Sequence, residues 1–382
     1  MSEVLDRPIR ADAQVLAAWI AAEIAPRADE LDAAQQIPPA LFTSIAKSGL
    51  LGACVPLSYG GAQYDARSIL TVCEALGRAS ASVLSLFTVH TMISSAIARW
   101  GNSAQRALWL PSLAGGETIG ALALSEPEAG SDTGGVRATL RRDGESLVLS
   151  GVKTWISFGQ VASVFLVSAI LDGRVAAVLV ERDNPGVCVT PVPEMTGFRA
   201  GMLARVEFDD CRLPATSLLG NPAFGLSQIV GSVLDHGRFC IAGGSAGLAR
   251  ACADVAIRHA RSRLTFGRPL AEHPLVQRLL TDLMVDSRAA WLMCLDAAAS
   301  RDARRPDMLV RTSAAKYFAA QAADKCAASA LQLHGASGLA VGHPVQRYLH
   351  DAKVMNLIEG STQIQQMLIA QSGMQWLQEW GI

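Results

Sequence analysis

The feature that most constrains the fold is a change in residue pattern at both ends of the central part of the chain. Between about residues 117 and 220 the sequence consists of short valine-rich runs, such as VFLVSAIL and RVAAVLVE, separated by Gly, Pro and Asp. This texture is typical of a compact antiparallel sheet. On either side, apolar residues recur at helical spacing, as in Leu226, Ile229, Val230 and Val233.

This order predicts an α+β fold that is mainly helical. We expect an N-terminal helical domain over residues 1–116, a central antiparallel β-sheet domain over 117–220 and a C-terminal helical domain over 221–382. A chain of 382 residues also exceeds what one hydrophobic core usually serves, which favours a division into domains.

Charge and hydropathy restrict the classes of partner. The net charge is −1, which argues against a nucleic-acid partner or an anionic membrane surface. Charged residues make up only 18% of the chain, and the mean hydropathy is +0.27. Such an apolar composition fits a protein that buries surface against copies of itself.

The cysteines and the N-terminus indicate a cytoplasmic protein. The chain has eight cysteines but no CxxC pair, which favours a reducing compartment over a disulfide framework or zinc site. The start, MSEVLDRPIR, has no apolar core of a secretory signal. The uncharged stretch from Ala79 to Ala98 could span a bilayer by length, but it contains several Ser and Thr residues and His90. We therefore expect a buried helix there and no membrane span.

Several common catalytic motifs are absent from the sequence. No GxGxxG follows a predicted strand, and no P-loop, HExxH or GxSxG occurs. The seven histidines show no ligand spacing, so we expect no metal site. An enzyme with this sequence would therefore depend on carboxylates or on an organic cofactor.

One carboxylate stands out near the C-terminus, in the segment LIEGSTQIQ. Glu359 lies between two apolar residues and a glycine. It could be an acid at the start of a helix, where it would complement the helix dipole. It could instead be a base in an apolar pocket, where desolvation would tune its pKa.

Three further segments could bind a polar, planar ligand. LALSEPEAGSD offers hydroxyls and free backbone N–H groups at the entry to the sheet domain. KTWIS places Trp155 and Ser157 two residues apart, which predicts that they share one side of a strand. RSRLTFGRPL is a basic helix end that could be solvated or could hold a phosphate.

These four segments, in this order and within this helix–sheet–helix pattern, resemble the acyl-CoA dehydrogenase family over nearly the whole chain. Parts of the sequence, such as IEGSTQIQQMLIAQ, also resemble the dehydrogenases of polyketide pathways that oxidise acyl groups on carrier proteins. The resemblance implies an FAD-dependent oxidoreductase that acts on CH–CH groups of acyl thioesters.

The resemblance also implies the roles of individual residues at the flavin. Within one subunit, the FAD contacts would be Leu122, Leu124, Ser125, Ser131, Trp155, Ile156, Ser157, Ser361, Thr362 and Gln363. Across a subunit interface, the contacts to the partner's FAD would be Arg263, Thr265, Phe266, Gln332 and Gly335. Two positions depart from the family pattern: Ala336 replaces a glycine, and His350 replaces an arginine whose loss the sequence does not explain.

Glu359 matches the catalytic base of the family. It would take the α-proton of the thioester while the β-hydride leaves to flavin N5. Some branches carry their base at the position of Gly237, so this chain has no substitute there. Ser131, Asp235 and Arg238 match residues on the substrate side.

The sequence leaves open the identity of the acyl group and of the thioester carrier that holds it, which we call the handle. The segment ASVLSLFTVHTMISS matches the acyl lining and favours a short or branched chain, carried by CoA or by an acyl carrier protein. We expect an electron acceptor such as an electron-transfer flavoprotein, and a homodimer or homotetramer. The rivals are an oxidase or hydroxylase of the same fold, which Glu359 disfavours, and a non-catalytic helical scaffold.

Overall fold

The computed structural model describes residues 12–379 and begins with a helical region. Four of its helix starts are capped by a side chain: Asp12 accepts from Gln14 N, Asp65 from Ser68 N, Ser80 from Val83 N, and Asn102 from Gln105 N. The α-helices are α1 (Ala13–Trp19), α2 (Ala28–Ala34), α3 (Pro39–Lys47), α4 (Ala66–Ala79), α5 (Ala81–Trp100) and α6 (Ser103–Gly115). Short π- and 3₁₀-helical turns connect them at Ile20–Ile24, Ala25–Arg27, Leu50–Gly52 and Leu57–Tyr59.

A seven-stranded sheet follows these helices. Its strands are β1 (Gly120–Ala123), β2 (Thr139–Asp143), β3 (Ser146–Ile156), β4 (Val164–Leu171), β5 (Arg174–Glu181), β6 (Val187–Pro191) and β7 (Ala204–Pro214). The spatial order is β1-β4-β2-β3-β7-β6, and β5 pairs with β4. Most neighbours are antiparallel, as predicted, but β1 runs parallel to β4, so the sheet is mixed. Strand texture does not reveal this, because the hairpin β2–β3 lies between these two strands in the chain.

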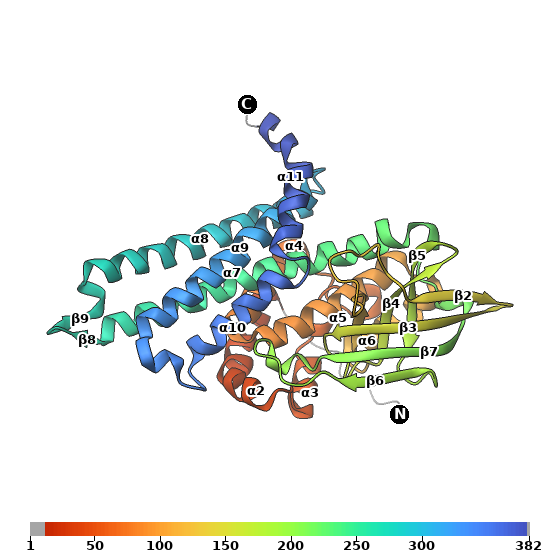
Figure 1. Ribbon diagram of the computed structural model, residues 1–382, viewed down its shortest axis with the longest axis horizontal. Coiled ribbons are helices and arrows are strands. Elements are labelled where there is room, and N and C mark those ends of the chain that lie inside the picture. The colour runs from red at the N-terminus through yellow and green to blue at the C-terminus, as the bar shows by residue number, and fades with distance from the viewer. Residues whose placement is uncertain (1–11, 380–382) are drawn as a thin grey trace.

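The C-terminal region is a helical bundle (Figure 1). Its helices are α7 (Gly231–Ser262), α8 (Pro274–Asp302), α9 (Met308–His334), α10 (Pro344–Leu357) and α11 (Thr362–Glu379). The small hairpin β8–β9 (Leu264–Thr265 and Arg268–Pro269) lies between α7 and α8. Short helical turns occur before α7 at Ala215–Ser217, Pro222–Phe224 and Gly225–Val230, and later at Leu270–Glu272 and Gly335–Leu339. The order helical region, sheet and helical bundle confirms the predicted fold class. The domain limits after residues 116 and 220 stay a prediction.

Glycines allow α7 to pack closely against α4 and α5. A Cβ at Gly244 would lie 2.0 Å from Leu84 Cδ2, and a Cβ at Gly77 would lie 2.0 Å from the backbone oxygen of Gly244. The predicted buried helix after Ala79 is α5, and it is buried for most of its length. Two helical stretches, Ala81–Trp100 and Pro222–Ser262, are long and apolar enough to span a membrane, but 89% and 78% of their apolar windows are buried inside the protein.

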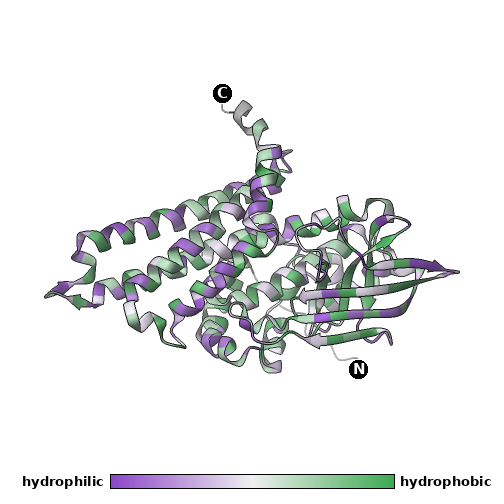
Figure 2. Cartoon of the chain, in the orientation of Figure 1, coloured by the Kyte–Doolittle hydropathy of each residue, from purple (hydrophilic) through white to green (hydrophobic). Residues whose placement is uncertain are grey.

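The segment between β6 and β7 joins the end of β3 to α10. Phe158 N, just after β3, donates to the backbone oxygen of Gly201 at 2.8 Å, and Phe198 N donates to Asp351 Oδ1 on α10 at 2.8 Å. On the other face of the sheet, Leu122 of β1 packs with Met92 and Val233 in one apolar cluster. Hydrophilic residues recur along α8, α9 and α10 (purple in Figure 2), while the apolar sides of the elements meet in the interior.

Candidate active site

The segment around Glu359 forms a tight turn between α10 and α11. Glu359 has φ 54° and Gly360 has φ 84°, so both lie in the left-handed region, which is costly for a glutamate. Three side chains hold the turn: Gln365 Nε2 donates to the backbone oxygens of Glu359 (3.0 Å) and Gly360 (3.1 Å), Lys316 Nζ donates to Gly360 O (2.7 Å), and Arg238 Nε donates to Glu359 O (3.4 Å). The strain is therefore balanced by hydrogen bonds from three different helices.

The Glu359 carboxylate is not engaged in capping a helix. Its Oε2 atom is buried without a hydrogen-bond partner, although the residue as a whole keeps some exposed surface. The carboxylate lies against the backbone of Gly237 on α7, where a Cβ would come within 2.2 Å of Oε2. An unpartnered carboxylate oxygen normally costs several kcal/mol relative to water, so this geometry favours a reactive group over a helix-dipole acid.

Burial raises the pKa of Glu359 to about 7. The nearby cations Arg238, Lys316 and His236 act in the opposite direction, whereas the Cys240 side chain raises the pKa further. A carboxyl group with a pKa near neutrality is partly ionised at physiological pH and still basic enough to take a proton from carbon.

The wall beside the carboxylate is built by α5 and α7. The terminal methyl group of Met92 would lie 3.0 Å from a Cβ at Gly237. One turn along α7, Cys240 Sγ lies 3.5 Å from His236 Nε2, which is also 3.0 Å from Thr91 Oγ1. His236 and Cys240 are four residues apart on α7, a spacing that is visible in the sequence, but only the packing of α5 on α7 brings Thr91 to them.

Asp235 and Arg238, which matched substrate-side residues, have different surroundings. Asp235 is buried and paired with Arg301 of α8, with 2.5 Å between Oδ2 and Nη1. Arg238 remains half-buried beside Glu359, and burial lowers its pKa below the ordinary value. Arg238 is thus placed at the candidate base, while the Asp235 carboxylate faces α8.

Trp155 and Ser157 lie where β3 ends. Trp155 has φ 59° at a bulge in the pairing with β7, and its side chain is 57% exposed. The prediction that it shares one strand side with Ser157 is wrong, because β3 ends at Ile156 and the left-handed backbone breaks the alternation. The exposed indole is nevertheless open to a ligand, which a core tryptophan would not be.

A buried ion pair fixes the loop LSEPEAGSD against the same strand. Lys153 Nζ donates to Glu126 Oε1 (2.7 Å), Leu124 O (3.0 Å) and Ser168 Oγ (3.1 Å). Burial favours the neutral acid, but the hydrogen bonds from Lys153 and from two backbone N–H groups hold the pKa of Glu126 below its ordinary value. The loop therefore has a rigid base, and Ser131 at its tip is exposed.

Comparison with known proteins agrees with this arrangement. The family models of the acyl-CoA dehydrogenase N-terminal, middle and C-terminal domains match residues 10–117, 121–211 and 224–374. The chain belongs to the acyl-CoA dehydrogenase family. It is therefore an oxidoreductase acting on CH–CH groups, with FAD as its cofactor.

Three similar proteins illustrate the breadth of this family. A probable acyl-CoA dehydrogenase, YngJ of Bacillus subtilis, is 34% identical over 91% of this chain and 93% of its own length. The mouse mitochondrial short-chain specific acyl-CoA dehydrogenase is 33% identical over 91% of this chain and 85% of its own length. The solved structure of FkbI, for biosynthesis of the methoxymalonyl extender unit of a polyketide, has a TM-score of 0.87 and 33% identity over 95% of this chain and 99% of that chain.

In this acyl-CoA dehydrogenase, the residues at the end of β3 and in the loop that begins at Leu124 have side chains that fit a flavin. The exposed indole of Trp155 offers a planar apolar face. The half-buried hydroxyls of Ser125 and Ser157 could meet polar ring edges, and Thr154 N bonds to Ser125 O at 2.9 Å, which ties the two segments together. Leu124 is buried beside them. Ser361 follows the Glu359 turn, and Thr362 and Gln363 are the first residues of α11. Thr362 Oγ1 donates to Asn356 O at 3.4 Å.

The remaining predicted flavin contacts lie far away in the same chain. Arg263 follows the end of α7, and Thr265 lies in the hairpin β8–β9 (Figure 1), where Phe266 is 93% exposed. Gln332 and Gly335 are exposed at the end of α9. The structure thus separates the residues at the ends of α7 and α9 from Glu359, whose carboxylate lies against Gly237 near the start of α7.

The two departures from the family pattern have simple surroundings. His350 Nδ1 lies 3.1 Å from Gln346 Nε2, and the backbone oxygen of His350 lies against Gly197 of the sheet domain. Ala336 is exposed. Among the side chains of residues 12–374, no cluster of His, Cys, Asp or Glu has a metal-binding arrangement.

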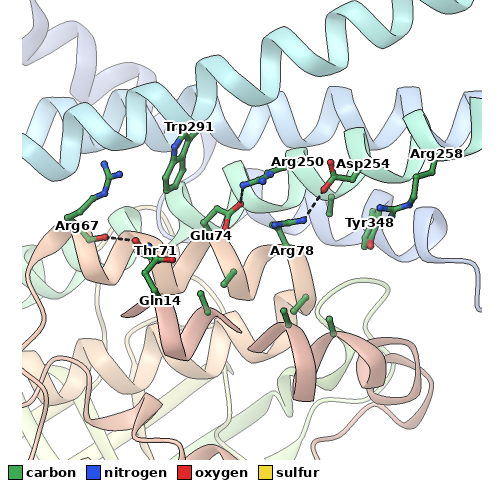
Figure 3. A pocket seen from close by; sticks show the side chains of 16 residues that line it. Gln14, Arg67, Thr71, Glu74, Arg78, Arg250, Asp254, Arg258, Trp291 and Tyr348 are labelled. Carbon is green, nitrogen blue, oxygen red and sulfur yellow. Dashed lines mark hydrogen bonds and ion pairs between the residues drawn. The ribbon is translucent and has the colours of Figure 1, made fainter. Parts of the chain in front are cut away.

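A cavity of about 460 Å³ lies apart from Glu359, between α1, α4, α7, α8 and α10 (Figure 3). It contains none of the predicted site residues. Two of its arginines are neutralised, since Arg78 pairs with Asp254 at 2.9 Å and Arg250 with Glu74 at 3.1 Å. This cavity therefore offers no support for the predicted site residues.

Proposed function

We propose that this acyl-CoA dehydrogenase uses Glu359 as the base that removes the α-proton of an acyl thioester. The observation that carries the proposal is the buried Oε2 of Glu359, which has no hydrogen-bond partner. Together with the raised pKa of about 7, it leaves one carboxylate oxygen available for a proton from substrate. The backbone position of Gly237 leaves room for the carboxylate.

The chain's own residues support each part of the reaction. Glu359 takes the α-proton on Oε2, and the turn that carries it is fixed by Arg238, Gln365 and Lys316. Met92 of α5, which is buried and lies beside Gly237, would exclude water from the carboxylate. Exclusion of water matters because a solvated carboxylate would return to a pKa near its ordinary value and be too weak a base.

Bound FAD would supply the acceptor for the β-hydride. Trp155 would lie against one face of its ring, with Leu122, Ile156 and Ser157 close by, and Leu124 and Ser125 at a polar ring edge. Ser361, Thr362 and Gln363 would contact the same cofactor from the start of α11. These assignments rest on the family motifs and on the open, polar surroundings of Trp155 described above.

The two separated groups of flavin residues support an oligomer in which subunits share cofactors. The α7 helix has 32 residues, so it is roughly 48 Å long at ~1.5 Å per residue. Gly237 lies near its start and Arg263 follows its end. Arg263, Thr265, Phe266, Gln332 and Gly335 would therefore serve the FAD of another subunit in a homodimer or homotetramer.

We further propose a short or branched acyl group. Met92 and Gly237 confine the space at the Glu359 carboxylate, and the mouse relative is short-chain specific by name. CoA is the first candidate for the handle, with Ser131, Arg238 and Asp235 on the substrate side. The similarity to FkbI, which acts in making a polyketide extender unit, supports a carrier protein as the second candidate. An electron-transfer flavoprotein would accept the electrons, and the enzyme would work in the cytoplasm.

The handle is tested by presenting one short acyl group on CoA and on an acyl carrier protein. Oxidation is followed with an artificial electron acceptor, and kcat/KM is compared for the two forms. We expect the CoA thioester to be the better substrate. A preference of a hundredfold or more for the carrier form would make carrier-linked acyl groups the substrate class. No oxidation of any thioester in a panel of short, branched and long chains would contradict the dehydrogenase assignment itself.

A further inference from the structure

Lys316 is a buried cation beside the candidate base. It lies on α9 and has no exposed surface. A lysine is rarely buried completely unless it is paired. Yet its ammonium group meets no carboxylate within salt-bridge distance among the side chains of residues 12–374, and the hydrogen bond that it donates goes to the backbone oxygen of Gly360 at 2.7 Å. Burial without a direct ion pair is costly, so a function of the charge should be sought in what surrounds it.

The charge of Lys316 acts on Glu359. Burial lowers the pKa of Lys316 to about 8, while the Glu359 carboxylate favours the charged form of the lysine and Arg238 opposes it. In return, Lys316 is one of the cations that hold down the pKa of Glu359. The ammonium and the carboxylate thus favour each other's charged form.

The other charged and titratable groups around Glu359 come from α7. They are Arg238 and His236, which favour the carboxylate, and Cys240, which opposes it. Gln365 from α11 touches the same turn but carries no charge. Lys316 is therefore the charged group that α9 contributes. It contacts the turn at the backbone oxygen of Gly360, the residue after Glu359.

We propose that Lys316 is a positioning residue for Glu359: it ties the Glu359–Gly360 turn to α9, and its positive charge keeps the carboxylate ionised and ready to accept a proton. The inference rests on the proposed function of Glu359. It also explains why a buried carboxylate with a free oxygen stays basic without becoming permanently protonated, since burial alone can raise a carboxyl pKa by several units.

The decisive variants are Lys316→Met and Lys316→Gln, studied as holoenzymes. Both remove the charge, but the glutamine keeps an N–H donor for Gly360 O. Gln365→Leu removes neutral hydrogen bonds from the same turn. Lys325→Met is the matched control, because Lys325 is on the same helix, is exposed and pairs with Asp286 at 2.7 Å.

Two measurements report the ionisation of Glu359. The first is infrared titration of the protonated carboxyl stretch, identified by its absence in Glu359→Gln, which needs no substrate. The second is the acid limb of kcat/KM for a short acyl-CoA with an artificial electron acceptor. We expect both to move upward by about one pH unit in the two Lys316 variants, the size typical of losing one nearby charge. Gln365→Leu should lower turnover without moving the limb, and Lys325→Met should match the wild type.

Each result has a clear meaning. A Lys316→Gln enzyme whose carboxyl titrates as in the wild type would overturn the inference, and this variant decides the question if Lys316→Met does not fold. An equal shift in Gln365→Leu would also overturn it, because loosening the turn would then suffice. Full activity of Glu359→Gln would instead remove the proposed base, while the infrared titration would still show whether Lys316 controls the ionisation of Glu359.

Discussion

At the scale of single residues, the site depends on a glutamate in a left-handed backbone conformation. Such a conformation costs of order 1–3 kcal/mol for a residue other than glycine. Here it is held by hydrogen bonds from Gln365 and Arg238 to the carbonyl of Glu359 itself. The conformation directs the carboxylate toward Gly237 on α7 instead of toward the first turn of α11. The backbone strain and the buried carboxylate are therefore two parts of one arrangement.

Replacing Glu359 by glutamine should lower turnover by at least ~10²–10⁴-fold, the usual effect of removing an acid–base group. The amide has nearly the same shape but cannot accept the α-proton. FAD should stay bound, because the assigned flavin contacts lie on other residues, so the visible flavin spectrum serves as the control. A variant that retained most of its kcat would exclude Glu359 as the base.

The pH dependence of kcat/KM should show an acid limb near pH 7. Glu359 must be ionised to act as a base, and burial raises its pKa from 4.5 to about 7. Activity should therefore be level above that pH and fall about tenfold for each pH unit below it. The limb should lie in the same place for several thioesters, because it belongs to the free enzyme. A limb near pH 4.5 would mean that the base is solvated.

At the scale of secondary-structure elements, close packing at glycines decides where the carboxylate lies. The α7 helix approaches α4 and α5 through Gly244, and it approaches the Glu359 turn through Gly237. At each of these positions a Cβ would meet a neighbour at 2.2 Å or less. The glycines of α7 thus determine both the core packing and the shape of the site.

Gly237→Ala should displace the Glu359 carboxylate and lower kcat/KM by roughly a hundredfold, comparable to the ~10²-fold cost of misplacing a reacting group by about 1 Å. Gly231→Ala is the matched control on the same helix, because a Cβ there meets its nearest neighbour only at 3.5 Å. Both enzymes should fold and bind FAD. Equal kcat/KM for Gly237→Ala and the wild type would show that the carboxylate does not need this space.

Gly77→Ala tests the packing without touching the site. The added methyl group would meet the backbone of Gly244, which cannot rotate away, so we expect a loss of about 1–3 kcal/mol in the free energy of unfolding. Chemical denaturation measures it. A stability equal to that of the wild type would mean that α4 and α7 can separate at little cost.

At the scale of the whole molecule, the length of α7 separates the residues around Glu359 from the hairpin β8–β9. Phe266 at the tip of that hairpin is 93% exposed, and an exposed aromatic side chain is a typical contact for another subunit. Apolar side chains are also exposed on α8, at Leu275 and Val285. These surfaces suit contact with further copies of the chain.

Arg263→Ala should therefore lower the affinity for FAD, seen as a smaller flavin-to-protein ratio after purification. Arg261→Ala is the control, since this arginine is also exposed at the end of α7 but was not assigned to the cofactor. Analytical ultracentrifugation should show an oligomer for the flavin-bound wild type. A fully flavinated monomer would contradict the sharing of cofactors between subunits.

The sequence by itself determined the order of helical and strand regions and the position of the chemically important segments. Both follow from local information: the spacing of apolar residues defines each element, and short motifs such as LIEGSTQIQ and KTWIS lie within one turn or strand end. Lys316 is one of several charged residues of α9, and nothing local in the sequence distinguished it from the others or connected it to Glu359.

Only the tertiary structure decided how these segments meet. The parallel pairing of β1 with β4, the bulge at Trp155 and the ion pair of Asp235 with Arg301 depend on contacts between residues distant in the chain. The pKa of Glu359 depends on them as well, because burial and the charges of Arg238 and Lys316 come from α7 and α9. A local residue pattern indicates which secondary structure a segment can form. Desolvation and electrostatic interactions depend instead on which segments become neighbours in space.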